Sequence, residues 1–257
     1  NWISKSSKGA VKIMTKRNQQ AVRQSRQNKK VETGRVIDPK FDKEVKPPVQ
    51  AKTAVQREFL QALANYDVVV LSAPAGVGKS FITMSEVSDW LKKGVYNRCV
   101  LTRPAVGMGN SIGLLKGDMR AKFEMYLLPL VEVMKDRYGV GWYENCLSNG
   151  SLVMLPMEYA RGMSISDVFV CEEMQNSKPD EMYTLITRLA EGGKLICIGD
   201  PNQNDLKGQN GIDWLCDFVE RNPELQKHIK VIKATSDDIV RSGLCKAIVK
   251  AKEKEIE

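Results

Sequence analysis

The fold is decided by the stretch Val68-Val69-Val70-Leu71-Ser72-Ala73-Pro74-Ala75-Gly76-Val77-Gly78-Lys79-Ser80. Its first part is a short apolar, β-branched run, which is typical of a strand buried on both faces of a sheet. A loop of small residues follows, and the sequence after Ser80 places apolar residues at helical spacing. A strand, a small-residue loop and a helix in this order form the context in which a loop wraps the phosphates of a nucleotide.

Each part of this loop has a role in holding phosphate and a divalent cation. We expect the backbone N–H groups of residues 73–80 to point inward, together with the positive N-terminal end of the following helix. The Lys79 ammonium would reach the outer phosphates, and the Ser80 hydroxyl would ligate Mg²⁺. The usual pattern begins with glycine where this chain has Ala73, a minor departure. The alternative is a turn that only resembles such a loop, and the flanking strand and helix argue against it.

Composition narrows the class of protein. The chain has 257 residues, is 42% hydrophobic, and contains neither an apolar run long enough for a transmembrane helix nor a signal-peptide pattern. Its six cysteines form no Cys-x-x-Cys pair and it has one histidine, so we expect no zinc site. Thiols inside apolar runs behave as small hydrophobic groups. We therefore expect a reduced, cytoplasmic protein.

The basic excess is concentrated in one segment. Of a net charge of +8, residues 1–50 carry +9, from 13 Lys/Arg and 4 Asp/Glu, and the remainder carries −1. This segment has too few apolar residues to offset the entropy of ordering it. Two readings stay open: a flexible basic arm that binds nucleic acid phosphates, and a solvated linker without a specific partner.

From residue 51 onward, apolar runs alternate with helical patterns. The expected helices lie near residues 52–64, 79–92, 119–137, 179–190 and 211–220. The expected strands are 67–71, 98–102, 151–156, 168–171, 194–198 and 229–233. This alternation predicts an α/β fold, with a mainly parallel sheet covered by helices on both faces, in one domain at residues 51–257.

A pair of carboxylates ends the apolar run at residues 167–171. In an open α/β sheet, ligands bind at the carboxyl ends of the strands. Glu172 would face the magnesium shell, and Glu173 would act as the general base that orients the attacking water. Such a pair usually begins with Asp, so Glu172 is one methylene longer than expected. The alternative is a charged exit from the strand without a role.

The run at residues 194–198 also delivers polar groups to this edge of the sheet. It is followed by Gly199-Asp200-Pro201-Asn202-Gln203. Gln203 could contact the terminal phosphate, and Asp200 could link that contact to a nucleic acid surface. A loop of Gly, Asp, Pro and Asn is equally compatible with a plain turn.

Four motifs in a fixed order establish a family resemblance. They are the loop at 73–80, Thr102-Arg103-Pro104-Ala105-Val106, the segment Glu172-Glu173-x-Gln175-Asn176, and Gly199-Asp200-x-x-Gln203. Together they resemble the PhoH-like family, which is similar to the first RecA-like domain of superfamily 1 helicases. The resemblance extends from about Thr53 to about Lys250 and implies a P-loop ATPase that uses ATP and Mg²⁺. Family members typically carry Asp-Glu where this chain has Glu172-Glu173.

The resemblance implies further site residues. Gln56 would read adenine, with a surface helix residue as the alternative. Thr102, Arg103 and Pro104 begin a segment, continuing to Asp118, that would face single-stranded nucleic acid. Arg161 would lie near that surface, or in an ordinary turn. Arg241 would act as an arginine finger on the next subunit's terminal phosphate, or form a surface salt bridge; such fingers accelerate hydrolysis by about 10³–10⁵.

The resemblance also implies partners. Too few residues follow Gln203 for a second RecA-like domain, so we expect either that another subunit completes the site or that the enzyme is weak alone. The resemblance favours the first, in a homo-oligomeric ring that is a hexamer in this family. The predicted function is an ATPase coupled to single-stranded RNA, or less favourably DNA, with helicase or remodelling output. The alternative is a nucleotide-dependent nucleic-acid-binding or regulatory module with slow hydrolysis and no unwinding. A small-molecule kinase fits less well, because of the Gly199–Gln203 motif.

Overall fold

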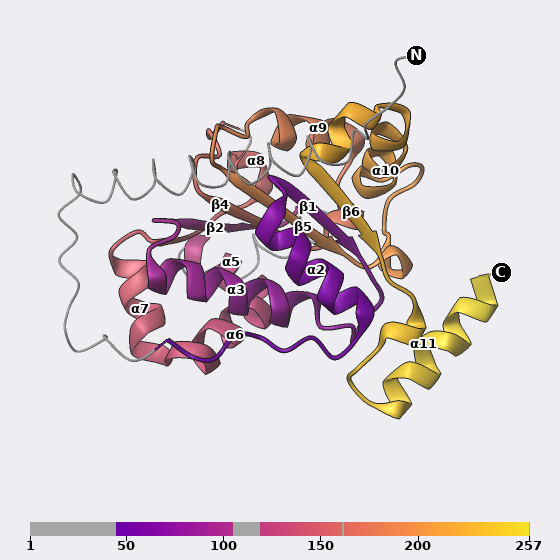
Figure 1. Ribbon diagram of the computed structural model, residues 1–257, viewed down its shortest axis with the longest axis horizontal. Coiled ribbons are helices and arrows are strands. Elements are labelled where there is room, and N and C mark those ends of the chain that lie inside the picture. Colours follow the sequence, from indigo (N-terminus) through magenta and orange to yellow (C-terminus); the bar gives the residue numbers. More distant parts are fainter. Residues whose placement is uncertain (1–44, 105–118, 161, 257) are drawn as a thin grey trace, which may run out of the picture. The chain divides into compact units, whose positions relative to one another are not determined.

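The computed structural model describes residues 45–104, 119–160 and 162–256. Six strands form one sheet in the order β3-β2-β4-β5-β1-β6, and every neighbouring pair is parallel (Figure 1). The strands are β1 (Val68–Ser72), β2 (Cys99–Thr102), β3 (Leu152–Met154), β4 (Val168–Cys171), β5 (Lys194–Gly199) and β6 (Ile229–Lys233). All six expected strands are therefore confirmed, two of them with the expected bounds and the others with ends that shift by at most two residues.

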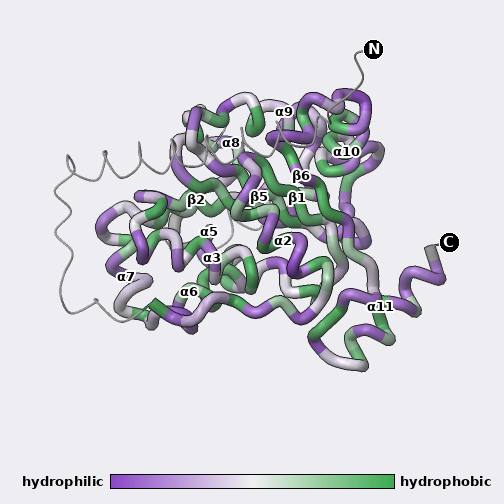
Figure 2. The backbone as a smooth tube through the Cα atoms, viewed as in Figure 1, coloured by the Kyte–Doolittle hydropathy of each residue, from purple (hydrophilic) through white to green (hydrophobic). Residues whose placement is uncertain are grey.

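The central strands are buried along their whole length and are mainly apolar. Every residue of β1, β2, β4 and β5 is buried, and Figure 2 shows these strands as hydrophobic segments in the middle of the fold. β1 lies between β5 and β6, so that Val70 is level with Cys197 on one side and Val231 on the other. Strands that are buried on both faces need this continuous apolar pattern, because neither face meets water.

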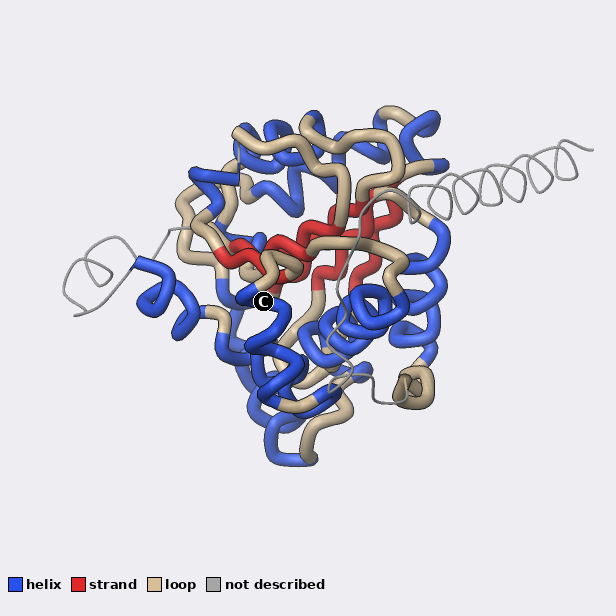
Figure 3. Tube along the Cα trace, turned by 90° about the vertical axis from the view of Figure 1, so that its left-hand side faces the viewer, coloured by secondary structure: helices blue, strands red, loops and turns tan. Residues whose placement is uncertain are grey.

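Helices cover both faces of the sheet (Figures 1 and 3). One layer contains α2 (Ala54–Asn65), α3 (Lys79–Lys93), α5 (Met119–Tyr126), α6 (Leu128–Tyr138) and α7 (Val140–Ser148). The other contains α8 (Met157–Ala160), α9 (Pro179–Thr187) and α10 (Gly211–Arg221). The helix α11 (Gly243–Ile256) follows β6 at the end of the described chain. Within the described residues, every helix is too short or too polar to cross a lipid bilayer.

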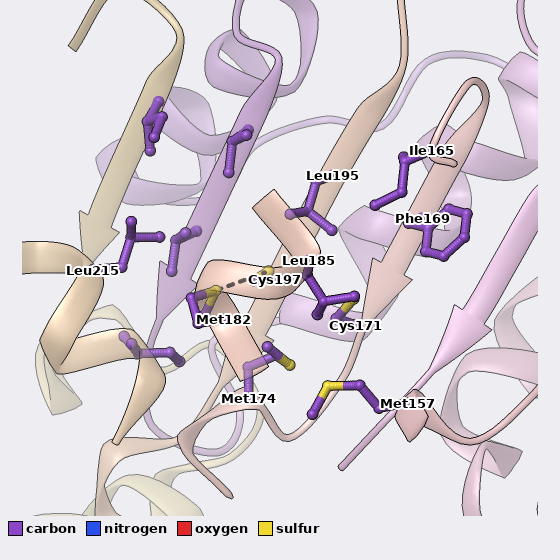
Figure 4. Packing of buried hydrophobic residues seen from close by; sticks show 14 of the residues in the cluster. Met157, Ile165, Phe169, Cys171, Met174, Met182, Leu185, Leu195, Cys197 and Leu215 are labelled. Carbon is purple, nitrogen blue, oxygen red and sulfur yellow. Dashed lines mark hydrogen bonds between the residues drawn. The ribbon is translucent and has the colours of Figure 1, made fainter. Parts of the chain in front are cut away.

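The layer of α9 and α10 packs on the sheet through a cluster of buried side chains (Figure 4). Alternate residues of the strands, such as Phe169, Leu195 and Cys197, point into it and meet Leu185 of α9 and Leu215 of α10. Each fully buried side chain of this size contributes about 1.5–3 kcal/mol to folding. The cluster packs β4 and β5 against α9 and α10, and these strands lead into the polar residues of the candidate site.

One predicted helix is divided in the structure, and three further helices were not predicted. The helix expected at 119–137 is divided into α5 and α6 at Leu127, since Pro129 in the first turn of α6 has no N–H to continue a helix. The three helices α7, α8 and α11 were not expected at all. Gly139 separates α6 from α7 with φ +86°, a backbone conformation that suits glycine.

The last residues of the segment expected to be a basic arm lie against α6. The Lys46 ammonium donates to the Asp136 carbonyl at 2.7 Å, and Arg137 donates to the Pro47 carbonyl at 2.9 Å. Arg137 also pairs with the buried Asp89 of α3 at 2.6 Å. A hydrogen-bonded charge pair of this kind fixes α3 against α6.

Candidate nucleotide site

The site is assembled at the carboxyl edge of three neighbouring strands. β1 leads into the loop 73–78, β5 leads into Asp200, and β4 leads into Glu172 and Glu173. Because these strands are adjacent and parallel, their carboxyl ends meet at one edge of the sheet. The structure thus brings together three of the motifs that are far apart in the sequence.

The loop between β1 and α3 presents main-chain donors. Gly76 and Gly78 have φ +88° and +96°, and no side chain caps the start of α3 at Gly78. The first hydrogen bond of the turn joins the Ile82 N–H to the Gly78 carbonyl at 3.0 Å. In the described part of the chain, the N–H groups of residues 76–81 have no acceptor. Unpaired N–H groups at a helix N-terminus fit a bound phosphate.

Lys79 is the first residue of α3, directly after this loop. Its ammonium donates to the carbonyls of Ala73 at 2.5 Å and Pro74 at 3.0 Å. Burial lowers the pKa of Lys79, and the nearby carboxylates of Asp200, Glu173 and Glu172 oppose that shift. The positive charge is thus placed where phosphate oxygens would meet the loop.

Ser80 and Glu172 form an oxygen pair suited to Mg²⁺. The Ser80 hydroxyl donates to Glu172 Oε1 at 3.3 Å. Glu172 is only 7% exposed, and its burial, followed by repulsion from Glu173, raises its pKa to about 7 against the opposing effects of Arg103, Ser80 and Lys79. Hard divalent cations prefer carboxylate and hydroxyl oxygens. The longer side chain of Glu172 still reaches Ser80, so the departure from Asp keeps the donor set together.

Glu173 adopts a strained backbone conformation. Its φ and ψ of 54° and 37° lie in the left-handed region, and it is the single non-glycine residue with positive φ among the described residues. Left-handed backbone at a non-glycine residue is costly and concentrates at functional sites. The turn directs the Glu173 carboxylate toward Gln175, whose Nε2 donates to Glu173 Oε2 at 2.5 Å.

Gln175 joins two motifs, a role that the sequence analysis missed. Its Nε2 also donates to the Gln203 carbonyl at 3.1 Å, and its Oε1 accepts from the Asp200 N–H at 3.0 Å. The residue is 1% exposed. Gly199 permits this approach, because a Cβ at that position would lie 2.7 Å from Gln175 Oε1. The sequence identifies Gln175 only as a member of the motif Glu172-Glu173-x-Gln175-Asn176, and it does not indicate which residues the side chain contacts.

Asp200 and Gln203 are linked to each other. Gln203 Nε2 donates to Asp200 Oδ2 at 2.8 Å, and the Asn202 N–H donates to Asp200 Oδ1 at 3.0 Å. Asp200 is 5% exposed, whereas Gln203 is exposed at the edge of the site. The side chain of Gln203 is thus held near the loop 73–80 through Asp200, whose charge also acts on Lys79.

Gln56 contacts the back of the phosphate loop. Its Nε2 donates to the Val77 carbonyl at 2.8 Å, and its Oε1 accepts from the Lys52 N–H at 2.7 Å. The side chain is 5% exposed. Recognition of adenine by Gln56 stays a prediction. The contact that the structure adds is support of the loop at Val77.

The end of β2 lies beside the carboxylates on β4. Thr102 is fully buried, and Pro104 is buried next to Arg103. Arg103 donates to the Tyr126 carbonyl at 3.0 Å and lies over the Tyr126 ring, and its charge lowers the pKa of Glu172. The loop that follows, residues 105–118, and Arg161 lie outside the described residues, so their assignment to nucleic acid stays a prediction.

The segment around Arg241 reaches the phosphate loop of the same chain. The Val240 N–H donates to the Gly76 carbonyl at 3.0 Å. This contact places Arg241 beside the site, although the sequence separates the two by most of the domain.

The PhoH-like protein family matches this chain over residues 48–253. The chain belongs to the PhoH-like family. The match includes the loop 73–80, both carboxylates and the segment of Arg241. A PhoH-like protein of Bacillus subtilis (strain 168) is 33% identical over 208 residues, which are 80% of this chain and 65% of the relative. Protein PhoH of Escherichia coli (strain K12) is 29% identical over 207 residues, 79% of this chain and 58% of that protein.

This PhoH-like chain therefore spans less than two thirds of the length of these curated relatives. Among solved structures, the large terminase of bacteriophage HK97 superposes with a TM-score of 0.50 at 14% identity, covering 82% of this chain and 48% of the terminase. That likeness concerns the fold alone. The expected fold class, a RecA-like α/β domain with a parallel sheet and helices on both faces, is confirmed.

Proposed function

We propose that this PhoH-like chain binds ATP with Mg²⁺ and hydrolyses it in a reaction coupled to single-stranded nucleic acid. The observation that carries the proposal is the arrangement of three elements at one sheet edge. These are the loop with unpaired N–H groups, the Ser80–Glu172 oxygen pair, and the strained Glu173 beside them. Donor groups fixed in advance around the reacting phosphate are what phosphoryl transfer requires of a protein.

Each residue has a defined task in this proposal. The N–H groups of the loop and the Lys79 ammonium bind the phosphate oxygens, and Ser80 and Glu172 hold the cation. A bound Mg²⁺ would supply positive charge to the phosphates. Glu173 accepts a proton from the attacking water, and Gln175 holds its carboxylate in place. Gln203, held by Asp200, would contact the terminal phosphate.

Coupling to nucleic acid is supported by the position of Arg103. This residue follows β2, is partly exposed and acts electrostatically on Glu172, so a strand bound at Arg103 would adjoin the carboxylates to which we assign hydrolysis. The basic segment at residues 1–50, with its charge of +9, would add sequence-independent phosphate contacts. We propose single-stranded RNA before DNA as the nucleic acid partner, on the basis of the family resemblance. We place Arg161 on the same proposed nucleic acid surface. We propose the cytoplasm as the compartment, because all six cysteines are free thiols.

The working form in this proposal is a homo-oligomeric ring, a hexamer by family resemblance. The site described lies at an edge of the sheet, and a RecA-like domain of this kind can be completed by a neighbouring subunit. Helicase or strand-remodelling activity would be the output of that ring.

A second function rests on Glu172. Its side chain is one methylene longer than that of the Asp that family members typically carry, which would alter the geometry in which the cation is held. Weak cation binding would make hydrolysis slow, and the chain would then act as a nucleotide-dependent nucleic-acid-binding or regulatory module without unwinding.

The deciding experiment measures ATP turnover against protein concentration, with and without single-stranded RNA or DNA. The first function predicts turnover that rises with RNA and is abolished by Lys79→Ala. Arg57→Ala, which removes an exposed positive charge on α2, is the control and should leave turnover unchanged. Turnover that no nucleic acid changes would exclude coupling, and a strand-displacement assay with ATP against a non-hydrolysable analogue separates the motor from the binding module.

A further inference from the structure

The segment that follows β6 packs directly on the phosphate loop. A Cβ at Gly76 would lie 3.1 Å from Ile239 Cγ2, 3.1 Å from Cys245 Sγ and 3.2 Å from Arg241 Cβ. The Val240 N–H donates to the Gly76 carbonyl. The loop that is to hold the phosphates is therefore in contact, at its tip, with the residues on both sides of Arg241.

The position of this segment is fixed within one chain. β6 pairs with β1, level at Ser72 and Lys233, and the Ala234 N–H then donates to the Ser72 carbonyl at 2.9 Å. Since β1 itself carries the phosphate loop, the same strand sets the place of both Gly76 and Arg241. A capped turn at 236–238 follows, with the Thr235 hydroxyl accepting from the Asp237 N–H.

The charges around Arg241 leave its guanidinium available. The nearby carboxylate of Asp237 is engaged by Lys250 at 2.7 Å and by Lys246 at 3.6 Å. Arg241 is exposed and, within the described residues, has no hydrogen bond or ion pair. An exposed arginine without a carboxylate partner, anchored beside unpaired loop N–H groups, fits a phosphate ligand.

We propose that Arg241 is a catalytic residue for the nucleotide bound to its own subunit, in place of the next subunit's nucleotide that the family resemblance implied. This inference rests on the proposed function. The oxygen of a water molecule bonds to the γ-phosphorus, the bond from that phosphorus to the β–γ bridging oxygen breaks, and a proton of the water passes to Glu173. ADP and inorganic phosphate result. The Arg241 guanidinium binds phosphate oxygens and stabilises the charge that develops on them.

Mixed subunits test which site Arg241 serves. Lys79→Ala and Arg241→Ala are each expected to lose about 10³-fold in ATP turnover. The two variants, carrying different tags, are then co-expressed and purified through both tags. A residue that acts within its own subunit predicts no recovery, because every subunit lacks either Lys79 or Arg241. Recovery of turnover in the mixed assembly would overturn the proposal, as would wild-type turnover by Arg241→Ala alone.

A binding measurement keeps the inference testable even if wild-type protein does not hydrolyse ATP, which would refute the proposed function. Affinity for ATP and for ADP is measured with a fluorescent nucleotide, at protein concentrations at which sedimentation shows monomers. Arg241→Ala should weaken ATP binding at least about tenfold and ADP binding less. Arg221→Ala, an exposed arginine on α10, is the control. Equal ATP affinity of wild type and Arg241→Ala in the monomer would overturn a role for Arg241 in its own subunit.

Discussion

Gln175 holds Glu173 by a short hydrogen bond, 2.5 Å from its Nε2 to the Glu173 Oε2. The same amide accepts from the Asp200 N–H, so the general-base candidate that follows β4 is joined to the loop after β5. A carboxylate with a strained backbone needs such support to keep one orientation. Gln175 is therefore a positioning residue, and its effect should appear in the rate of the chemical step.

Replacing Gln175 with alanine should lower kcat for ATP by about 10–100-fold, while KM changes little, because the phosphate loop makes no contact through this amide. The Asp200 N–H would lose its acceptor, at a cost of about 1–3 kcal/mol in the free energy of unfolding. Steady-state kinetics and urea unfolding measure the two effects. Gln209→Ala, at an exposed glutamine that pairs with Asp217, is the control. An unchanged kcat in Gln175→Ala would contradict the positioning role.

Glu173 allows strain and chemistry to be separated. Both Glu173→Gly and Glu173→Ala remove the carboxylate and should lower turnover by about 10²–10⁴-fold. Glycine accepts φ 54° without strain, whereas alanine does not, so the glycine variant should be more stable by about 1–2 kcal/mol. Thermal or urea unfolding of the two variants measures the difference. Equal stability would show that this backbone conformation carries no strain.

The metal-free protein should lose stability as the pH rises toward neutrality. Burial raises the pKa of Glu172 from its ordinary value of 4.5 to about 7. The folded state therefore holds this proton more tightly than the unfolded chain, so the stabilisation is complete below about pH 4.5 and disappears as the pH passes about 7. The free energy of unfolding should fall by about 2–4 kcal/mol over that range because of Glu172 alone.

Glu172→Gln is the comparison that isolates this effect. Burial also raises the pKa of Glu86, with the same sign, but Glu86 is present in both proteins and cancels in their difference. Urea unfolding between about pH 4.5 and pH 8, with EDTA present, should show a wild-type curve that falls relative to the variant. Parallel curves would mean that Glu172 is not the buried acid described.

The sheet could be predicted from the sequence because its strands are buried on both faces. A continuous apolar run such as β1 or β5 has few structural alternatives once a loop and a helix follow it. The order of the strands in the sheet and the register of their pairing could not be predicted, because both depend on contacts between distant parts of the chain. The helix α11 was missed for a different reason: its second half, from Lys250 to Glu255, consists of charged residues and one alanine, so its apolar pattern is short.

The chemistry of the site was predictable where each residue belongs to a motif whose role is recognisable by itself, and not where a contact involves a residue outside such a motif. Ser80 and Glu172 were each recognised from their own strand and loop, and the structure places them 3.3 Å apart. The approach of Cys245 to Ala75 joins residues 170 positions apart and leaves no local pattern. Gln175 was visible as a motif residue, but its partners at Asp200 and Gln203 belong to another strand.

Gly76 tests whether the segment at 239–245 supports the phosphate loop. In Gly76→Ala the new methyl group would press on Ile239, Arg241 and Cys245 at 3.1–3.2 Å, in addition to the strain of φ +88°. Gly139 is a matched control, since it has φ +86° and open space around the position of a Cβ. Both alanine variants should lose about 1–2 kcal/mol of stability to backbone strain, and Gly76→Ala should lose about 1 kcal/mol more through overpacking.

Nucleotide binding separates these variants further. Because Gly76 contacts the segment that carries Arg241, displacement of that segment should weaken ATP binding in Gly76→Ala at least about tenfold. Gly139→Ala should bind ATP as wild type does, since Gly139 lies between α6 and α7, outside the loop. Fluorescent-nucleotide titration and urea unfolding give the two readouts. If Gly76→Ala matched Gly139→Ala in both, the contact with Arg241 would have no part in holding the phosphates, and the unpaired N–H groups and Lys79 would hold them alone.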